Sequence, residues 1–102
     1  IVRYPVTYNH AELTERMRPT LERVAGPGKA QVIPPTTTAE DFSEFQKLVP
    51  GLFVHLGVRR PGATIDDYAP NHSPRFRVDE DGLEIGVRTL AHLALDWLQS
   101  ER

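Results

Sequence analysis

The stretch Leu52-Phe53-Val54-His55-Leu56-Gly57-Val58 decides the fold class, because it is the longest nearly continuous apolar run in the chain. A short run of this kind is typical of a strand that is covered on both faces, as in α/β proteins. Two further short strands are predicted at 1–4 and 30–33, and proline closes each of them. We therefore expect a mixed α/β fold in the order strand, helix, strand, helix, strand, loop, helix.

Two helices are predicted before this run from apolar residues at spacings of three and four. The first begins after Asn9, a good N-cap, and Gly26-Pro27-Gly28 stops it. The second begins after Thr38 and ends at Pro50-Gly51. Their apolar positions are Leu13, Met17, Leu21 and Val24 in the first, and Phe42, Phe45, Leu48 and Val49 in the second.

The last helix has the clearest pattern and begins after Asp79. Its predicted buried stripe consists of Leu83, Val87, Leu90, Ala94 and Leu98. A polar stripe at spacing four, suited to ion pairs, consists of Glu84, Arg88, His92 and Asp96. Ahead of this helix, residues 59–74 show no periodicity and predict a long loop. Loops of that length inside compact domains tend to be functional.

The composition is that of a globular domain and excludes several classes of function. The 102 residues carry a net charge of −2, with 39% apolar and 25% charged side chains. No basic excess indicates a nucleic-acid partner, and no apolar run approaches the ~20 residues that span a bilayer. The absence of cysteine excludes thiolate metal sites and cysteine nucleophiles within the chain. It leaves the compartment open, with the cytoplasm favoured, and the start at Ile1 leads us to expect a piece of a longer protein.

The four histidines differ in what their surroundings predict. His10 is expected to be a solvated first-turn residue, and His92 a member of a surface ion pair. His55, inside the apolar run, is expected to be a core histidine with one hydrogen bond. His72 lies in the irregular loop between two prolines that restrict the backbone, so it is the best candidate for a metal ligand or proton carrier.

Glu40 and Asp41 are the other candidates, with two readings. Adjacent carboxylates at a helix start can stabilise the helix dipole, or they can line a site. A catalytic zinc takes about three protein ligands. The chain provides one good ligand, His72, and no ligand pair at useful spacing. If His72 binds a metal, the remaining ligands therefore come from outside this chain.

Several groups of residues together resemble the C-terminal end of one family. They are Pro34-Pro35-Thr36-Thr37-Thr38-Ala39-Glu40-Asp41-Phe42-Ser43, Val49-Pro50-Gly51-Leu52-Phe53 with Leu56-Gly57, Asn71-His72-Ser73-Pro74-Arg75-Phe76, and Asp79-Glu80 ahead of the last helix. The family is the zinc-type amidohydrolases of metallopeptidase family twenty, which includes aminoacylases, hippurate hydrolases and auxin-conjugate hydrolases. The resemblance covers nearly the whole chain, and the distance between the two central motifs makes it specific.

The resemblance implies domains, a reaction and residue roles. Residues 1–37 would be the C-terminal part of an inserted lid or dimerisation domain, and residues 38–102 the closing part of a zinc-exopeptidase-like catalytic domain. The reaction would be hydrolysis of the amide bond of an N-acyl amino acid or similar conjugate by metal-activated water. His72 would be a metal ligand, and Glu40 and Asp41 would line the site. The metal would be zinc, with manganese, cobalt or nickel as alternatives, completed by residues outside this chain.

Two interpretations follow. The leading one is the C-terminal fragment of a metal-dependent amidohydrolase, inactive alone because it lacks most ligands and the general base. Its parent would be a homo-oligomer that acts on small molecules, without nucleic-acid or membrane partners. The alternative is a small non-catalytic α/β module for dimerisation or binding. Paired histidine, aspartate or cysteine ligands and a Glu-Glu upstream of Ile1 would support the enzyme, and a start codon close to Ile1 would favour the module.

Overall fold

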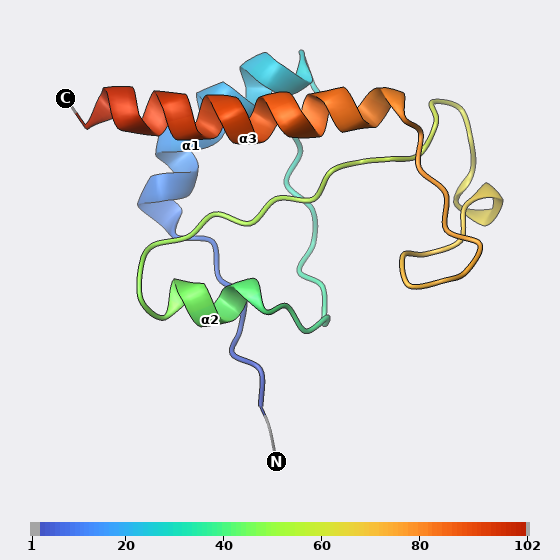
Figure 1. Cartoon of the computed structure of the whole chain (residues 1–102), viewed down its shortest axis with the longest axis horizontal. Helices are drawn as coiled ribbons and strands as arrows, with labels where there is room; N and C mark the ends of the chain where they lie inside the picture. Colours follow the sequence, from blue (N-terminus) through green and yellow to red (C-terminus); the bar gives the residue numbers. More distant parts are fainter. Residues whose placement is uncertain (1–2, 102) are drawn as a thin grey trace.

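The computed structural model describes residues 3–101 as four helical segments joined by long loops. They are α1 (Ala11–Ala25), α2 (Phe42–Gln46), the 3-10 turn η1 (Ile65–Asp67) and α3 (Asp81–Ser100). In Figure 1, α3 crosses the top of the molecule with α1 against it, and α2 lies below them. None of these helices combines the length and apolar character needed to cross a membrane.

The first predicted helix is confirmed, except that its N-cap is a different residue. α1 starts one residue later than expected, because the N-cap is His10, whose Nδ1 accepts the Leu13 N–H at 3.4 Å. It ends at Gly26, which has a φ of 94° and donates its N–H to the Glu22 carbonyl. A φ in this region suits glycine, so the sequence marks the end of this helix correctly.

The second helix is shorter than the sequence predicts. α2 begins after Asp41 rather than Thr38, and it ends before Leu48 and Val49, which are exposed. Phe42 stacks at a tilt on Phe53, with ring centroids 5.6 Å apart, and this contact ties α2 to the apolar run.

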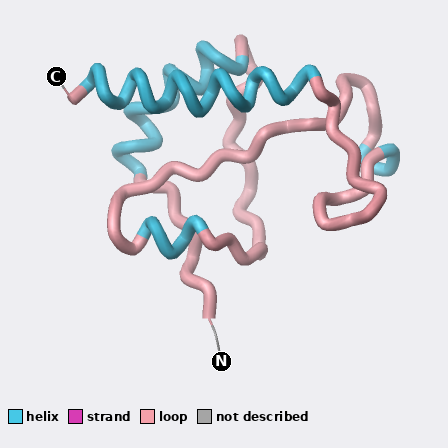
Figure 2. Tube along the Cα trace, in the orientation of Figure 1, coloured by secondary structure: helices cyan, strands magenta, loops and turns pink. Residues whose placement is uncertain are grey.

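The predicted α/β fold is wrong for residues 3–101, which contain helices and loops and no strand (Figure 2). Residues 30–33 and 52–58 lack strand pairing, and of the first predicted strand Ile1 and Val2 lie outside the described residues. A strand exists only where a neighbouring backbone supplies hydrogen-bond partners along its length. Apolar character alone therefore predicted strands that this chain does not pair.

The side-chain amides of Asn9 and Gln46 each bond to the backbone N–H and carbonyl of one residue, as a neighbouring strand would. Asn9 accepts from the Phe53 N–H at 2.7 Å and donates to its carbonyl at 2.9 Å. Gln46 does the same at Tyr8, accepting from the N–H at 3.0 Å and donating to the carbonyl at 2.9 Å. An amide carries both a donor and an acceptor, so one side chain satisfies both backbone groups of one residue. Together with the Phe42–Phe53 contact, these paired bonds join residues 8–9, α2 and the segment 52–58.

The contact between α1 and α3 contains the buried core of the described residues. The buried apolar side chains are Met17 and Val24 of α1, and the polar Thr20 is buried between them. The Thr20 hydroxyl donates to Asp96 of α3 at 2.5 Å, and Arg23 forms an ion pair with the same carboxylate. The hydrogen bond from Thr20, reinforced by the hydrogen bond and charge of Arg23, holds the pKa of Asp96 below its ordinary value.

A second polar contact joins the first half of α1 to the C-terminal end of α3. Arg16 of α1 forms an ion pair with Glu101 at 2.7 Å and donates to Ser100. Its guanidinium also lies 4.3 Å from the ring centroid of Trp97, at a distance typical of a cation–π contact. The partners on α3 move toward its start as α1 advances from Arg16 to Arg23, so the two helices run antiparallel.

The prediction of which face of α3 is buried is wrong. Leu83, Val87, Leu90, Ala94 and Leu98 are exposed. The side turned toward α1 includes His92 and Asp96, which the sequence placed on the solvent face. Of the expected ion pairs along α3, Glu84 and Arg88 lie 3.9 Å apart, whereas Asp96 pairs with Arg23. The helical period identifies the faces of α3, but it does not say which face each neighbour covers.

Two glycines allow the segment 52–58 to pass close to α3. A Cβ on Gly86 would lie 2.8 Å from Cδ2 of Leu56, and one on Gly82 would lie 3.2 Å from the Gly57 carbonyl oxygen. Residues four apart share one side of a helix. Because these two positions lack side chains, the segment 52–58 can cross α3 in close contact with its backbone.

Asp96→Asn should flatten the acid dependence of stability. Because the pKa of Asp96 is lowered in the folded state, its stabilising contribution is complete above the unfolded pKa of about 4 and is lost as the pH falls through the folded value. Thermal unfolding of the native protein and the variant between neutral pH and pH 2 measures this. The matched control is Glu84→Gln, which removes a carboxylate from an exposed pair. Superimposable profiles for native protein and Asp96→Asn would contradict the assignment.

Candidate functional site

His72 is exposed on the loop between η1 and α3, and its backbone is unusual. Its φ is 71°, and it is the one non-glycine residue among residues 3–101 with a positive φ. The left-handed region costs an L-residue roughly 1–2 kcal/mol. Such conformations persist where the surroundings impose them, and they cluster at functional sites.

The loop around His72 is fixed by short-range hydrogen bonds. The Ser73 N–H donates to the Pro70 carbonyl at 3.1 Å, and the Phe76 N–H donates to the Ser73 carbonyl at 3.0 Å. The Ser73 hydroxyl oxygen also accepts from the Arg75 N–H at 3.1 Å. These consecutive turns fix the backbone that follows His72, whose side chain is exposed.

The earlier part of the same loop is anchored at η1. Asp67 accepts from the N–H of Thr64 at 2.7 Å and from its hydroxyl at 2.8 Å. These two hydrogen bonds lower the pKa of Asp67, with the hydroxyl making the larger contribution. A hollow of about 670 Å³ lies between this part of the loop and the part that follows His72, lined by residues 65–69 and 74–77. Hydrogen bonds therefore fix the loop at η1, and its two parts enclose a hollow between them.

Glu40 and Asp41 lie at the start of α2. Glu40 is half-buried, its Oε1 accepts from the Phe42 N–H at 3.1 Å, and its backbone carbonyl accepts from the hydroxyl of the buried Ser43 at 2.6 Å. Asp41 is exposed, and its side chain makes no capping hydrogen bond to α2. In this chain Glu40 therefore stabilises the helix start, whereas the carboxylate of Asp41 projects into solvent.

The structure does not gather the predicted residues into one metal site. Within residues 3–101, no group of three or more histidine, cysteine, aspartate or glutamate side chains could hold a metal ion. Figure 1 shows α2 and the loop that precedes α3 in separate parts of the molecule. The exposed imidazole of His72 suits a single ligand position, and the donor set of a complete site would need residues from outside this range.

The other three histidines have contacts that account for them. His10 caps α1, and His92 approaches Arg23 with 3.4 Å between its Nδ1 and the guanidinium. His55 packs edge-on against the ring of Phe53 at 5.4 Å, but it is exposed, so its prediction as a core residue is wrong.

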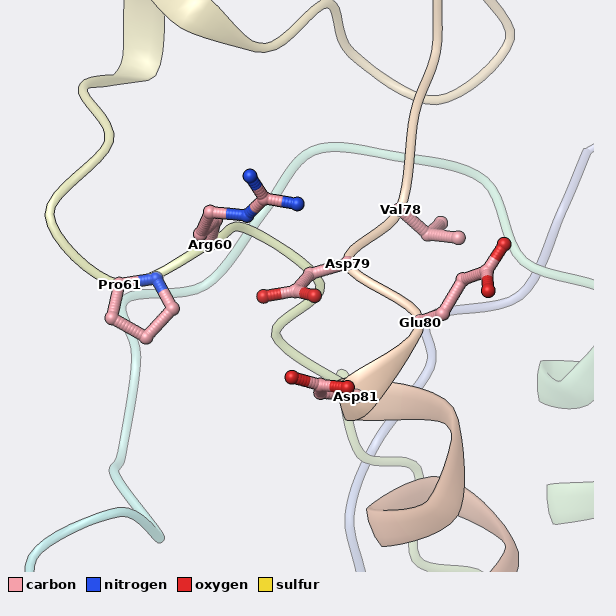
Figure 3. A pocket seen from close by; sticks show the side chains of 6 residues that line it. All are labelled: Arg60, Pro61, Val78, Asp79, Glu80 and Asp81. Atoms are coloured by element: carbon pink, nitrogen blue, oxygen red, sulfur yellow. The ribbon is translucent and has the colours of Figure 1, made fainter.

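A second hollow, of about 520 Å³, lies at the start of α3 (Figure 3). It is lined by Arg60, Pro61, Val78, Asp79, Glu80 and Asp81. In Figure 3 the side chains of Asp79 and Asp81 lie on the side of Arg60, and Glu80 points the other way. Carboxylates at a helix start are favoured by the helix dipole, which explains this acidic cluster. The N-cap is Glu80 rather than the expected Asp79, whose N–H donates to the Val58 carbonyl at 2.7 Å.

Sequence reasoning missed the residues that hold the site's scaffold together. Asn9 was expected to cap the first helix and Gln46 offered no pattern, yet each bonds to the backbone of a residue about 40 positions away. Thr20 and Asp96 are likewise 76 residues apart. Gly82 and Gly86 carried a usable signal, since glycines four apart within a helix indicate the close approach of another segment.

Comparisons with known proteins identify the family of the chain. Residues 2–96 match the family model described as peptidase family M20/M25/M40. The chain is 36% identical over 94 residues to thermostable carboxypeptidase 2 of Saccharolobus solfataricus, covering 90% of this chain and 22% of that protein. It is 30% identical over 97 residues to IAA-amino acid hydrolase ILR1-like 2 of Arabidopsis thaliana, covering 95% of this chain and 21% of that protein. The chain thus spans about a fifth of the length of these curated relatives. No solved structure gives a significant match.

Replacing His72 by glycine should leave the protein more stable than replacing it by alanine, by about 1 kcal/mol. Both changes remove the imidazole, but only glycine adopts a φ of 71° without steric cost. Denaturant unfolding of the two variants, each compared with the native protein, gives the difference. Equal stabilities, or a more stable alanine variant, would show that the backbone at this position is not constrained as described.

Proposed function

The chain belongs to peptidase family M20/M25/M40, and on that premise we propose that it is the C-terminal part of a metal-dependent amidohydrolase acting on N-acyl amino acids or similar conjugates. The parent, meaning the longer family protein to which this chain corresponds, is a hydrolase. One relative is named as a hydrolase of IAA-amino acids and another as a carboxypeptidase. Both names describe cleavage beside an amino acid, which supports an amide bond as the target.

The observation that carries the proposal is the conformation of His72. A left-handed backbone fixed by consecutive turns presents an exposed imidazole, the side chain that zinc and related metals commonly bind. We assign His72 as one ligand of a divalent metal, zinc in the first instance, with the other ligands and the general base supplied by the rest of the parent. When bound, the metal would polarise the substrate carbonyl and lower the pKa of an attacking water.

Glu40 and Asp41 are assigned different roles beside this metal. Glu40 fixes the start of α2 through its bond to the Phe42 N–H, so it would act by positioning this segment. Asp41, the next residue, has an exposed carboxylate that would line the substrate cleft of the parent. Assembly of the parent as a homo-oligomer and the division into segments 1–37 and 38–102 stay predictions, and α1 of the first segment packs along α3 of the second.

The 102-residue chain alone should hydrolyse no N-acyl amino acid. It offers one ligand position and no group of metal-binding side chains within residues 3–101, so the reacting water has no activated site. Release of free amino acid in the presence of zinc, manganese or cobalt measures the activity. Metal-dependent turnover by the purified chain would contradict the proposal that the site is incomplete.

In the parent, His72→Ala should lower the amidase rate by at least about a hundredfold and reduce the bound metal. Loss of one of about three or four ligands weakens both metal retention and activation of water. Metal content by elemental analysis is measured beside the rate. The matched control is His92→Ala, which removes an imidazole that contacts Arg23 on the far side of α3 from the apolar stripe. Unchanged metal content and rate in His72→Ala would remove His72 from the ligand set.

A further inference from the structure

The hollow lined by residues 65–69 and 74–77, here called the η1 hollow, carries charges of both signs. Its charged lining residues are Asp66 and Asp67 on the part of the loop before His72, and Arg75 and Arg77 on the part after it. No ion pair of residues 3–101 includes Asp66, Arg75 or Arg77. Opposite charges that line one hollow without neutralising each other suit a ligand that itself carries charges of both signs.

The two carboxylates of the η1 hollow differ in how free they are to bind a ligand. Asp67 accepts both hydrogen bonds of Thr64, which lower its pKa, so it belongs to the scaffold of the loop. Asp66 is exposed and has no ion-pair partner within residues 3–101. Asp66 is therefore the carboxylate that a positively charged group in the hollow would meet.

Two aromatic side chains add apolar surface to the η1 hollow. Tyr68 and Phe76 both line it, and Phe76 is 41% exposed. The hydroxyl oxygen of Tyr68 accepts from the backbone N–H of Arg60 at 3.2 Å, which holds the ring in place. Long basic side chains lay their methylene stems along apolar surface and keep the charged end free for a polar partner. The hollow therefore suits a ligand whose positive charge stands at the end of an aliphatic chain.

The volume and position of the η1 hollow suit the substrate of a metal held by His72. Its volume of about 670 Å³ lies within the roughly 300–1,000 Å³ of small-molecule sites. His72 lies in the chain between the two parts of the lining. Turn hydrogen bonds donated by the N–H groups of Tyr68 and Phe76, at 3.3 and 3.0 Å, fix both parts, so little order has to be imposed when a ligand binds.

We propose that the η1 hollow binds the amino-acid part of the substrate and selects N-acyl derivatives of basic amino acids. Arg75 and Arg77 bind the α-carboxylate, a group that guanidinium side chains recognise through paired hydrogen bonds. Asp66 binds the cation at the end of the side chain, whose stem lies along Phe76. The inference rests on the proposed function, because the acylated α-nitrogen of such a substrate is neutral and the positive charge must therefore come from the side chain.

Hydrolysis of two matched substrates by the metal-loaded full-length parent tests this inference. Nα-acetyl-lysine and Nα-acetyl-norleucine have the same four-carbon side chain, and only the first carries an ammonium group. We expect kcat/KM to be about tenfold higher for the lysine derivative, the usual effect of one exposed charge-assisted hydrogen bond. Asp66→Asn should bring the ratio close to one. The matched control is Glu84→Gln, which removes an exposed carboxylate of α3 and should keep the ratio.

The two arginines are tested on the same pair of substrates. Arg75→Gln combined with Arg77→Gln should raise KM for both compounds alike by roughly tenfold or more, because both carry the α-carboxylate. An unchanged KM would contradict the role given to the arginines.

Failure of the inference and failure of the proposed reaction give different results. Equal kcat/KM for the two compounds, or a ratio that Asp66→Asn leaves unchanged, would overturn the selection of basic amino acids while leaving an active amidohydrolase. If neither compound is hydrolysed, calorimetry on the metal-free parent decides, since it needs no turnover. Tighter binding of the lysine derivative that Asp66→Asn abolishes then supports the hollow, and equal binding, or binding of neither compound, overturns it.

Discussion

The contact between α1 and α3 around Asp96 is the interaction on which the rest of the described structure depends. Few apolar side chains are buried there, chiefly Met17 and Val24, so hydrogen bonds and ion pairs to one carboxylate supply much of the specificity. Partly exposed ion pairs stabilise proteins only weakly. The arrangement therefore fixes how the two helices meet, although only two apolar side chains, Met17 and Val24, are buried in residues 3–101.

The predictions from sequence that were correct are those that depend on local signals. The position and end of α1 followed from local signals, namely its apolar spacing and the Gly26-Pro27-Gly28 stop. The strand at 52–58 was wrong because a strand needs a partner backbone, and here Asn9 satisfies one residue of the segment with its side chain. The prediction of the buried face of α3 was wrong because amphipathicity reports which face is apolar, and residues 3–101 leave that face exposed.

The candidate site shows a similar division between local and distant information. The loop that contains His72 was predictable from its prolines and lack of periodicity, and its ordered turns agree with a functional segment. The left-handed backbone at His72 could not be read from residue types, since histidine adopts it only where neighbouring turns impose it. Residues 3–101 hold no group of side chains that could complete a metal site, so the proposed metal would take its other ligands from the rest of the parent.

The central claim is that His72 supplies one ligand to a metal completed by the rest of the parent. Crystallography of the metal-loaded parent, with anomalous data collected at the absorption edge of zinc, tests it most directly. The account predicts an anomalous peak about 2.1 Å from an imidazole nitrogen of His72, with its other ligands from residues upstream of this chain. A fully coordinated metal whose ligands do not include His72 would contradict it.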